Sequence, residues 1–109
     1  MTLSMIDTIP ALLAGCTVMI KPSEVTPRFV EPLMVAIDEA GLSDVLTFVQ
    51  GDGATGAALI DHVDAVCFTG SVTTGRKVAA AAAGNMIPAF LELGGKDPLL
   101  VLETADVDK

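Results

Sequence analysis

Glu92 is the residue whose surroundings suit acid–base chemistry, since it stands in the apolar run Leu91-Glu92-Leu93 and two glycines follow at once. An ionised carboxylate without water is costly, so it acquires a partner or its protonated form is favoured. A carboxylate tuned in this way suits general-base work near neutral pH. The glycines would let a ligand or a second backbone come close. The alternative is a glutamate at a strand end that simply reaches solvent.

A second pair of groups lies in Lys21-Pro22-Ser23-Glu24. A carboxylate accepts hydrogen bonds from ribose hydroxyls, and a neighbouring ammonium can donate to them. This pair therefore indicates a sugar-binding turn, and the alternative is a capped surface turn.

The pattern Gly51-x-Gly53-x-x-Gly56 matches the dinucleotide fingerprint, and it follows an expected strand and opens an expected helix. The fingerprint also needs an acidic residue about 20 residues later, at the end of the next strand. That strand ends in Phe68-Thr69-Gly70 without one, so the usual pyrophosphate geometry is not predicted here.

Ser71 follows Gly70 and opens an alanine-rich segment. The free N–H groups of a helix N-terminus, its dipole and a serine hydroxyl together favour a phosphate. The alternative is an ordinary serine cap.

Apolar residues at helical spacing and short apolar, β-branched runs predict the helices and strands that would hold these groups. We expect Pro10 to kink the first helix or mark a break in it, and Pro32 to distort the second helix locally. Gly15, Gly41 and Gly84 are expected to follow or end helices. The expected helices span residues 3–14, 27–40, 57–62 and 72–83, and the expected strands span 17–20, 45–49, 64–68, 87–93 and 98–102.

Strands that alternate with helices through short connections form parallel sheets with right-handed crossovers. The fold class is therefore α/β, a Rossmann-like parallel sheet with flanking helices. Ligands of such sheets lie beyond the carboxyl ends of the strands. Those ends are residues 21–24, 51–56, 69–75 and 92–95, so every candidate group is expected on one edge.

Composition excludes several classes of function. The 109 residues suffice for one small domain, and 14 acidic against 6 basic residues give a formal charge of −8. This charge argues against binding to nucleic acid or an anionic membrane surface. Cys16 and Cys67, with His62 as the one histidine, predict no metal site. We expect both thiols to be buried in a cytoplasmic protein, and no apolar run reaches membrane-spanning length.

Three motifs together resemble the aldehyde dehydrogenase superfamily. They are Lys21-Pro22-Ser23-Glu24, Phe68-Thr69-Gly70-Ser71 with Gly75 four residues on, and Leu91-Glu92-Leu93-Gly94-Gly95-Lys96. Residues 14–18 and 51–56 are also similar to the family, so the resemblance covers essentially the whole chain.

The resemblance implies NAD as the cofactor, with NADP as an alternative, an aldehyde as the substrate and a homo-oligomer. Glu92 would be the general base that activates the catalytic thiol or the hydrolytic water. Lys21 and Glu24 would hold the adenosine ribose, and Ser71 would contact the pyrophosphate. The remaining implied cofactor-binding residues are Ser23, Gly53, Phe68, Gly70, Thr74, Gly75, Leu93 and Gly94.

The departures from the family pattern matter equally. The family's nucleophilic cysteine lies beyond Lys109, and its oxyanion-hole asparagine precedes this segment. We therefore expect residues 1–109 to be a partial cofactor-binding domain, truncated at both ends, which does not oxidise aldehydes alone. One alternative is a non-catalytic nucleotide-binding or interaction module. Another is a relative that transfers the acyl group to an acceptor other than water, which the presence of Glu92 disfavours.

Overall fold

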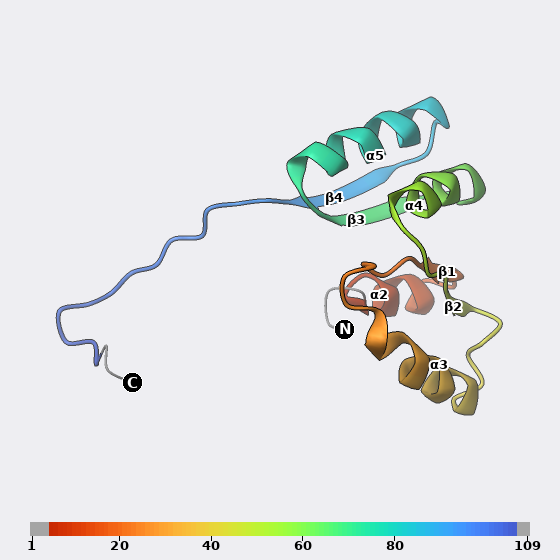
Figure 1. Ribbon diagram of the computed structural model, residues 1–109, viewed down its shortest axis with the longest axis horizontal. Coiled ribbons are helices and arrows are strands. Elements are labelled where there is room, and N and C mark those ends of the chain that lie inside the picture. The colour runs from red at the N-terminus through yellow and green to blue at the C-terminus, as the bar shows by residue number, and fades with distance from the viewer. Residues whose placement is uncertain (1–4, 107–109) are drawn as a thin grey trace.

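The computed structural model describes residues 5–106 as alternating helices and strands (Figure 1). The elements in chain order are α2 (Thr8–Leu13), β1 (Val18–Ile20), the 3₁₀ turn η1 (Pro27–Phe29), α3 (Val30–Glu39), β2 (Leu46–Phe48), α4 (Gly53–Leu59), the 3₁₀ turn η2 (Ile60–His62), β3 (Val66–Gly70), α5 (Val72–Gly84) and β4 (Ala89–Leu93).

The strands pair in parallel, as predicted. Strand β1 pairs with β2, from Val18 opposite Leu46 to Ile20 opposite Phe48. Strand β3 pairs with β4 over residues 66–70 and 89–93. Within the described residues these are two separate two-stranded sheets rather than one continuous sheet. The α/β class is therefore confirmed, in the form of two short parallel pairs with helices beside them.

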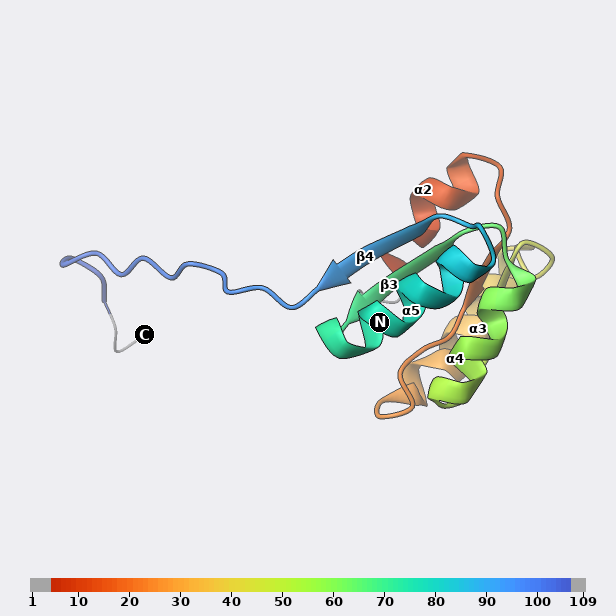
Figure 2. The ribbon, with the colours of Figure 1, turned by 90° about the horizontal axis from the view of Figure 1, so that it is seen from above.

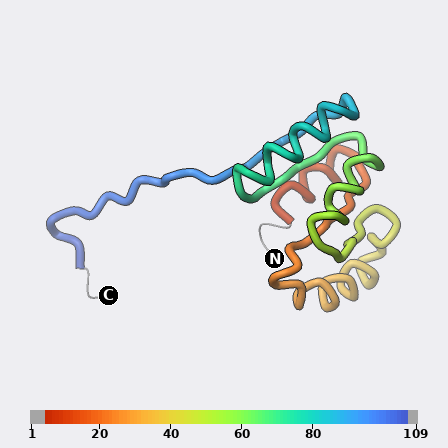
Figure 3. Tube along the Cα trace, turned by 45° about the horizontal axis from the view of Figure 1, so that its top comes forward, coloured from red at the N-terminus to blue at the C-terminus, as the bar shows by residue number. Residues whose placement is uncertain are grey.

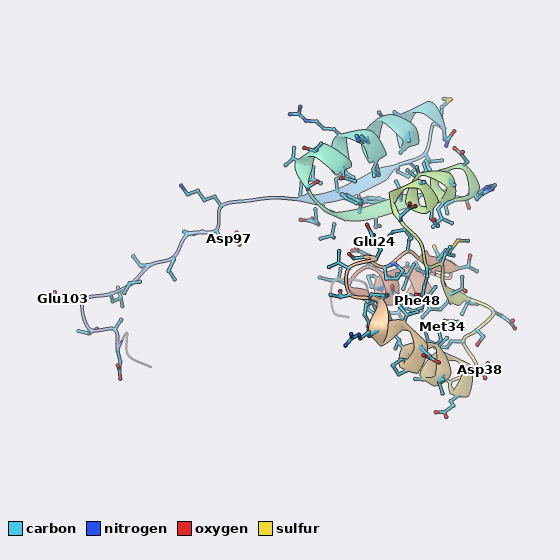
Figure 4. The ribbon with its side chains drawn as sticks, viewed as in Figure 1. Glu24, Met34, Asp38, Phe48, Asp97 and Glu103 are labelled. Carbon is cyan, nitrogen blue, oxygen red and sulfur yellow. The ribbon has the colours of Figure 1, made fainter. Side chains whose placement is uncertain are left out.

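The N-terminal half has its own hydrophobic core. Strands β1 and β2 place apolar side chains against α3, and the Phe29 and Phe48 rings meet edge to face with centroids 6.2 Å apart. Figure 4 shows Phe48 inside this half. The buried members of the cluster are Ile20, Val30, Ile37, Leu46 and Phe48.

The C-terminal half is built on α5, which runs alongside β3 and β4 (Figure 2). Ala82 of α5 is almost fully buried. At the far end of this helix, Asn85 donates from Nδ2 to Asp61 Oδ1 at 2.8 Å, which ties the end of α5 to η2. Helix α5 thus covers one face of the β3–β4 pair.

Both predicted helices are interrupted about one turn before their prolines, as expected: a turn at residues 6–7 precedes α2, and the 3₁₀ turn η1 precedes α3. Pro10 is the third residue of α2 and Pro32 the third residue of α3. Proline has no N–H to donate to the carbonyl four residues earlier, at Ile6 and Arg28, so the α-helical pattern does not continue back through those residues. Residues 3 and 4 of the first predicted helix lie outside the described range. Gly15 and Gly41 follow α2 and α3 with φ of 84° and 69°, as expected of helix stops.

The predicted fifth strand, residues 98–102, does not form. The chain after β4 extends away from both halves (Figures 1 and 3), and the apolar side chains on it are exposed. A strand needs a neighbour for its backbone groups, and no strand within residues 5–106 pairs with this segment. β-propensity alone therefore did not decide its structure.

Candidate functional site

The turn after β1 is held by Lys21. Its ammonium Nζ donates to Pro22 O at 2.6 Å, to Gly51 O at 2.9 Å and to Glu24 Oε2 at 3.3 Å. The Lys21 side chain is 19% exposed and the Glu24 side chain 58%. Backbone hydrogen bonding at Glu24 and then the Lys21 ammonium hold the pKa of the Glu24 carboxyl below its ordinary value of 4.5. The site therefore presents an ionised, accessible carboxylate near neutral pH.

Ser23, which precedes Glu24 in this turn, takes part in a weaker local hydrogen bond. Ser23 Oγ accepts a hydrogen bond from Val25 N at 3.3 Å, and Ser23 is exposed. A shallow hollow of about 240 Å³ follows directly along the chain, and it includes none of the predicted site residues. It is lined by Val25, Thr26, Pro27 and Arg28.

The glycine-rich segment after β2 is mostly helix rather than turn. Helix α4 begins at Gly53, four residues earlier than predicted, because Asp52 caps it. The Asp52 carboxylate accepts from Ala54 N at 2.9 Å and Thr55 N at 3.3 Å. A carboxylate thus occupies the place where the fingerprint would bind a phosphate, and it would repel one. The absence of an acidic residue at the end of β3 also argues against the usual pyrophosphate geometry of the fingerprint.

The end of β3 leads directly into α5 through Gly70 and Ser71. Ser71 Oγ accepts from Thr74 N at 3.2 Å, and its hydroxyl donates to Thr74 Oγ1 at 3.1 Å. The Phe68 ring folds back beside Gly70. Because Ser71 and Thr74 are exposed, this helix N-terminus is open to solvent, as a phosphate-binding end must be.

Glu92 lies on the same edge of the β3–β4 pair as the Gly70–Ser71 turn, whereas the turns after β1 and β2 belong to the separate β1–β2 pair. In the register of β3 and β4, Glu92 stands opposite Thr69, and Leu93 stands opposite Gly70. The base candidate is thus one step along the strand from the Gly70–Ser71 turn. Gly94 follows Leu93 and is exposed.

The expectation that Glu92 is shielded from water is wrong for the described residues. Burial alternates along β4: Leu91 and Leu93 are half-buried, whereas Phe90 and Glu92 are exposed. Helix α5 covers only one face of the pair, so alternate side chains of the apolar run point to the open face. The exposed Glu92 side chain agrees with the alternative prediction, a glutamate at a strand end that reaches solvent.

Packing between α5 and β4 fixes their relative position. Gly75 is buried, and the Leu93 side chain occupies the space where a Cβ on Gly75 would lie. The close approach expected of Gly75 is therefore made by a leucine of the neighbouring strand.

Both cysteines are exposed, contrary to the expectation of buried thiols. Cys16 lies before β1, at the amino end of the strands, and Cys67 lies inside β3 opposite Phe90. Partial desolvation and then the Asp7 carboxylate raise the pKa of the Cys67 thiol above its ordinary value. Neither thiol is at the carboxyl edge with Glu92.

Residues 5–106 contain no cluster of three or more His, Cys, Asp or Glu side chains arranged to hold a metal ion. None of the described helices has both the length and the apolar character needed to cross a membrane.

Comparison with known proteins agrees with the three motifs. The sequence model of the Aldehyde dehydrogenase family matches residues 1–109. The chain belongs to the aldehyde dehydrogenase family. It is 48% identical over 102 residues to betaine aldehyde dehydrogenase of Rhizobium leguminosarum bv. trifolii, a match that covers 91% of this chain and 21% of that protein. The chain thus spans about a fifth of the length of the curated relatives it matches.

Solved structures of family members are also similar. PutA of Anabaena variabilis shares 65% identity with a TM-score of 0.88, over 99% of this chain and 23% of its own. The aldehyde dehydrogenase of Mycobacterium tuberculosis, solved in complex with NAD+, shares 43% identity with a TM-score of 0.79, over 91% of this chain and 21% of its own. The parallel pairs described above are therefore the fold of a segment of this family.

Sequence reasoning missed how Lys21 is used. Its bond to Gly51 O joins residues 30 positions apart, and no local pattern indicates such a partner. The cap by Asp52 had a signal, because aspartate directly before the first helical residue is a favoured N-cap. The cap was not predicted because the glycines around Asp52 were interpreted as a dinucleotide fingerprint.

Proposed function

We propose that this chain carries the cofactor-binding region and the general base of an NAD(P)-dependent aldehyde dehydrogenase, which oxidises an aldehyde to a carboxylic acid through a cysteine thioester. The register that sets Glu92 opposite Thr69, beside the Gly70–Ser71 turn, is the observation that carries the proposal. It supports a base and a phosphate-binding helix end on one edge of a parallel pair.

The residues present fit a dinucleotide. The exposed Glu24 carboxylate can accept bonds from ribose hydroxyls, and the first-turn amides of α5 with the Ser71 hydroxyl can face a pyrophosphate. The implied neighbours of the cofactor are Lys21, Ser23, Gly53, Phe68, Thr74, Gly75, Leu93 and Gly94. An ionised Glu24 disfavours the extra phosphate of NADP, so NAD is the proposed cofactor, and its nicotinamide would supply the hydride acceptor.

Glu92 would take a proton from the thiol or from the water that hydrolyses the thioester. Its exposure leaves it free to meet a water molecule or an approaching thiol. Since neither Cys16 nor Cys67 lies at this edge, we infer that the nucleophile is not among these 109 residues. The segment alone, residues 1–109, is then a partial domain that binds the cofactor without turning over an aldehyde.

Calorimetric titration with NAD tests the binding part of the proposal. We expect the 109-residue chain to bind NAD, and binding to weaken in Glu24→Gln; Lys77→Met, a charge change on the exposed face of α5, is the control. Absence of any heat of binding would count against the proposal.

An activity assay tests the second part. The chain mixed with NAD and a simple aldehyde should form no NADH. Protein-dependent NADH formation that disappears in Glu92→Gln would show that the nucleophile is present after all.

The second candidate is a nucleotide-binding or interaction module without chemistry. It is favoured by the position of both thiols away from Glu92. Fusing this chain to a cysteine-bearing catalytic segment of a relative distinguishes the two: restored oxidation that requires Glu92 supports the enzyme, whereas NAD binding with no restored activity supports the module.

A further inference from the structure

We propose that Asn85 is a positioning residue, whose side chain joins the turn before β4 to the turn before β3 and so fixes where along β3 the Glu92 carboxylate lies. Asn85 Nδ2 donates to Asp61 Oδ1 at 2.8 Å, a short bond to a carboxylate. The use of Glu92 as a base rests on the proposed function, whereas the bond and the strand register do not.

The Asn85–Asp61 bond connects the entrances to two neighbouring strands. Asp61 belongs to η2, and three residues separate η2 from β3; Asn85 directly follows α5, and β4 begins four residues later. Since β3 and β4 are parallel, both entrances lie at the same end of the pair. Between them the Val66 amide donates to Pro88 O at 3.0 Å. The side-chain bond therefore ties the two starting points of the pair together.

The η2 side of this contact is firmly packed. Ile60 O accepts a second, longer bond from Asn85 Nδ2, at 3.4 Å. Ile60 is only 4% exposed, so the residue beside Asp61 is anchored among apolar side chains. The C-terminal end of α5 thus lies beside η2 (Figure 2). Asn85 is held against a fixed element rather than against a free loop.

The turn that follows Asn85 is strained. Met86 has φ of 58°, in the left-handed region that favours glycine. Its side chain is 93% exposed, so side-chain packing does not hold it there. Ile87 N donates to Ala82 O at 3.0 Å, which closes the helix end as in a Schellman motif. Strained backbone persists where its surroundings impose it, and the Asn85 side chain makes the tertiary contact directly before this residue.

The apolar pattern of β4 does not fix its register by itself. Leu91 and Leu93 are half-buried, whereas Glu92 is exposed on the other face. A slip by one residue would exchange the two faces. A slip by two would put Leu91 in the place of Leu93, so packing on α5 would change little, yet Glu92 would move about 7 Å along β3. Glu92 would then no longer stand opposite Thr69. A contact at the strand entrance excludes this second slip.

Hydrogen exchange and NMR without any nucleotide test the proposal. Asn85→Asp keeps the size of the side chain and sets a second carboxylate against Asp61. We expect the Val66 amide to exchange about tenfold faster, the loss of one charge-assisted bond. The nuclear Overhauser contacts between the backbone protons of Thr69 and Glu92 should weaken at the same time. Unchanged exchange at Val66 would overturn the proposal.

An amide in the other half of the chain separates positioning from general stability. Val18 N donates to Val45 O at 2.8 Å, in the separate β1–β2 pair. In Asn85→Asp its exchange should stay unchanged, because the lost bond acts only on β3 and β4. Equal acceleration at Val18 would mean that the whole chain is destabilised, and it too would overturn the proposal.

A reciprocal exchange of side chains tests the contact itself. Asp61→Asn added to Asn85→Asp reverses donor and acceptor, and it should return Val66 exchange to within about twofold of the unaltered chain. The control adds Asp64→Asn to Asn85→Asp instead. It restores the same net charge three residues further along and should not rescue. Equal rescue by both pairs would show a charge effect rather than the Asn85–Asp61 bond.

A measurement on the unaltered chain covers the case in which Asn85→Asp does not fold. The chain has one asparagine, Asn85, and one glutamine, Gln50, so their side-chain amide signals are unambiguous. The Nδ2 protons of Asn85 should exchange more slowly than the side-chain amide protons of the exposed Gln50. Equal rates would contradict the bond.

Calorimetric titration with NAD distinguishes failure of this inference from failure of the proposed function. If the unaltered chain binds no NAD while Val66 exchange depends on Asn85, the positioning role stands and the proposed function fails. If the chain binds NAD while Asn85→Asp leaves Val66 exchange and the contacts between Thr69 and Glu92 unchanged, the proposed function stands and the positioning role fails.

Discussion

The Leu93 side chain lies against Gly75, in the space that the Cβ of any other residue would fill. Leu93 ends β4 and Gly75 lies in the first turn of α5, so this contact fixes the helix start against the strand that carries Glu92. The spacing between the Ser71 cap and the Glu92 edge therefore depends on one glycine.

Gly75→Ala should destabilise the chain by about 1–3 kcal/mol, because the new methyl group forces Leu93 to move. Urea unfolding followed by circular dichroism measures this. Gly84→Ala in the same helix is the control: its Cβ meets no atom within 4 Å, and we expect it to stabilise by up to about 1 kcal/mol through helix propensity. Equal stability of the two variants would refute the packing account.

The N-terminal core gives a second prediction. Ile37 of α3 is 7% exposed, whereas Val35 of the same helix is 55% exposed. Ile37→Ala should cost about 2–5 kcal/mol, since it leaves a cavity beside β2. Val35→Ala should change the free energy of unfolding by no more than about 0.5 kcal/mol. The ranking would be contradicted if the two substitutions cost the same in urea unfolding.

Local patterns predicted the elements well where local chemistry decides them. Helix α5 was expected over residues 72–83 and spans Val72–Gly84. Alanine has a high helix propensity and serine is a favoured N-cap, so the local sequence is enough to predict this helix. The parallel pairing followed from the alternation of strands and helices. Both depend on neighbours in sequence.

The predictions that the structure contradicts concern features that depend on contacts between segments distant in the sequence. The apolar run around Glu92 favoured a carboxylate without water, yet Glu92 is exposed and its neighbour Phe90 is 62% exposed. Residues 98–102 have strand-like composition but no partner strand within residues 5–106. The hydrogen bond from Lys21 to Gly51 joins two loops, and the residues around neither position predict it. Segments remote in sequence decide all three.

The pKa of Glu24 gives a prediction about pH. It is lowered in the folded chain from an ordinary value of 4.5, so the Glu24 interactions stabilise fully above pH 4.5 and are lost as the pH falls through the lower folded value. A carboxyl-carbon NMR titration should place the Glu24 midpoint below 4.5. In Lys21→Met the midpoint should move upward, and in Lys77→Met it should not. A Glu24 midpoint indifferent to Lys21 would contradict the observed ion pair.

The apolar segment after β4 leads to a prediction of self-association. Leu99 and Leu100 are 89% and 83% exposed on an extended chain that carries no charge over residues 98–102. An extended apolar segment with unpaired backbone groups is prone to pair with another chain. Sedimentation velocity should show species larger than the monomer, increasing with concentration. Leu100→Lys should shift the distribution toward monomer, because a charge opposes strand addition. Thr104→Lys, which makes the same charge change just beyond the apolar residues, should shift it less. A chain that sediments as a monomer at every concentration would rule out this association.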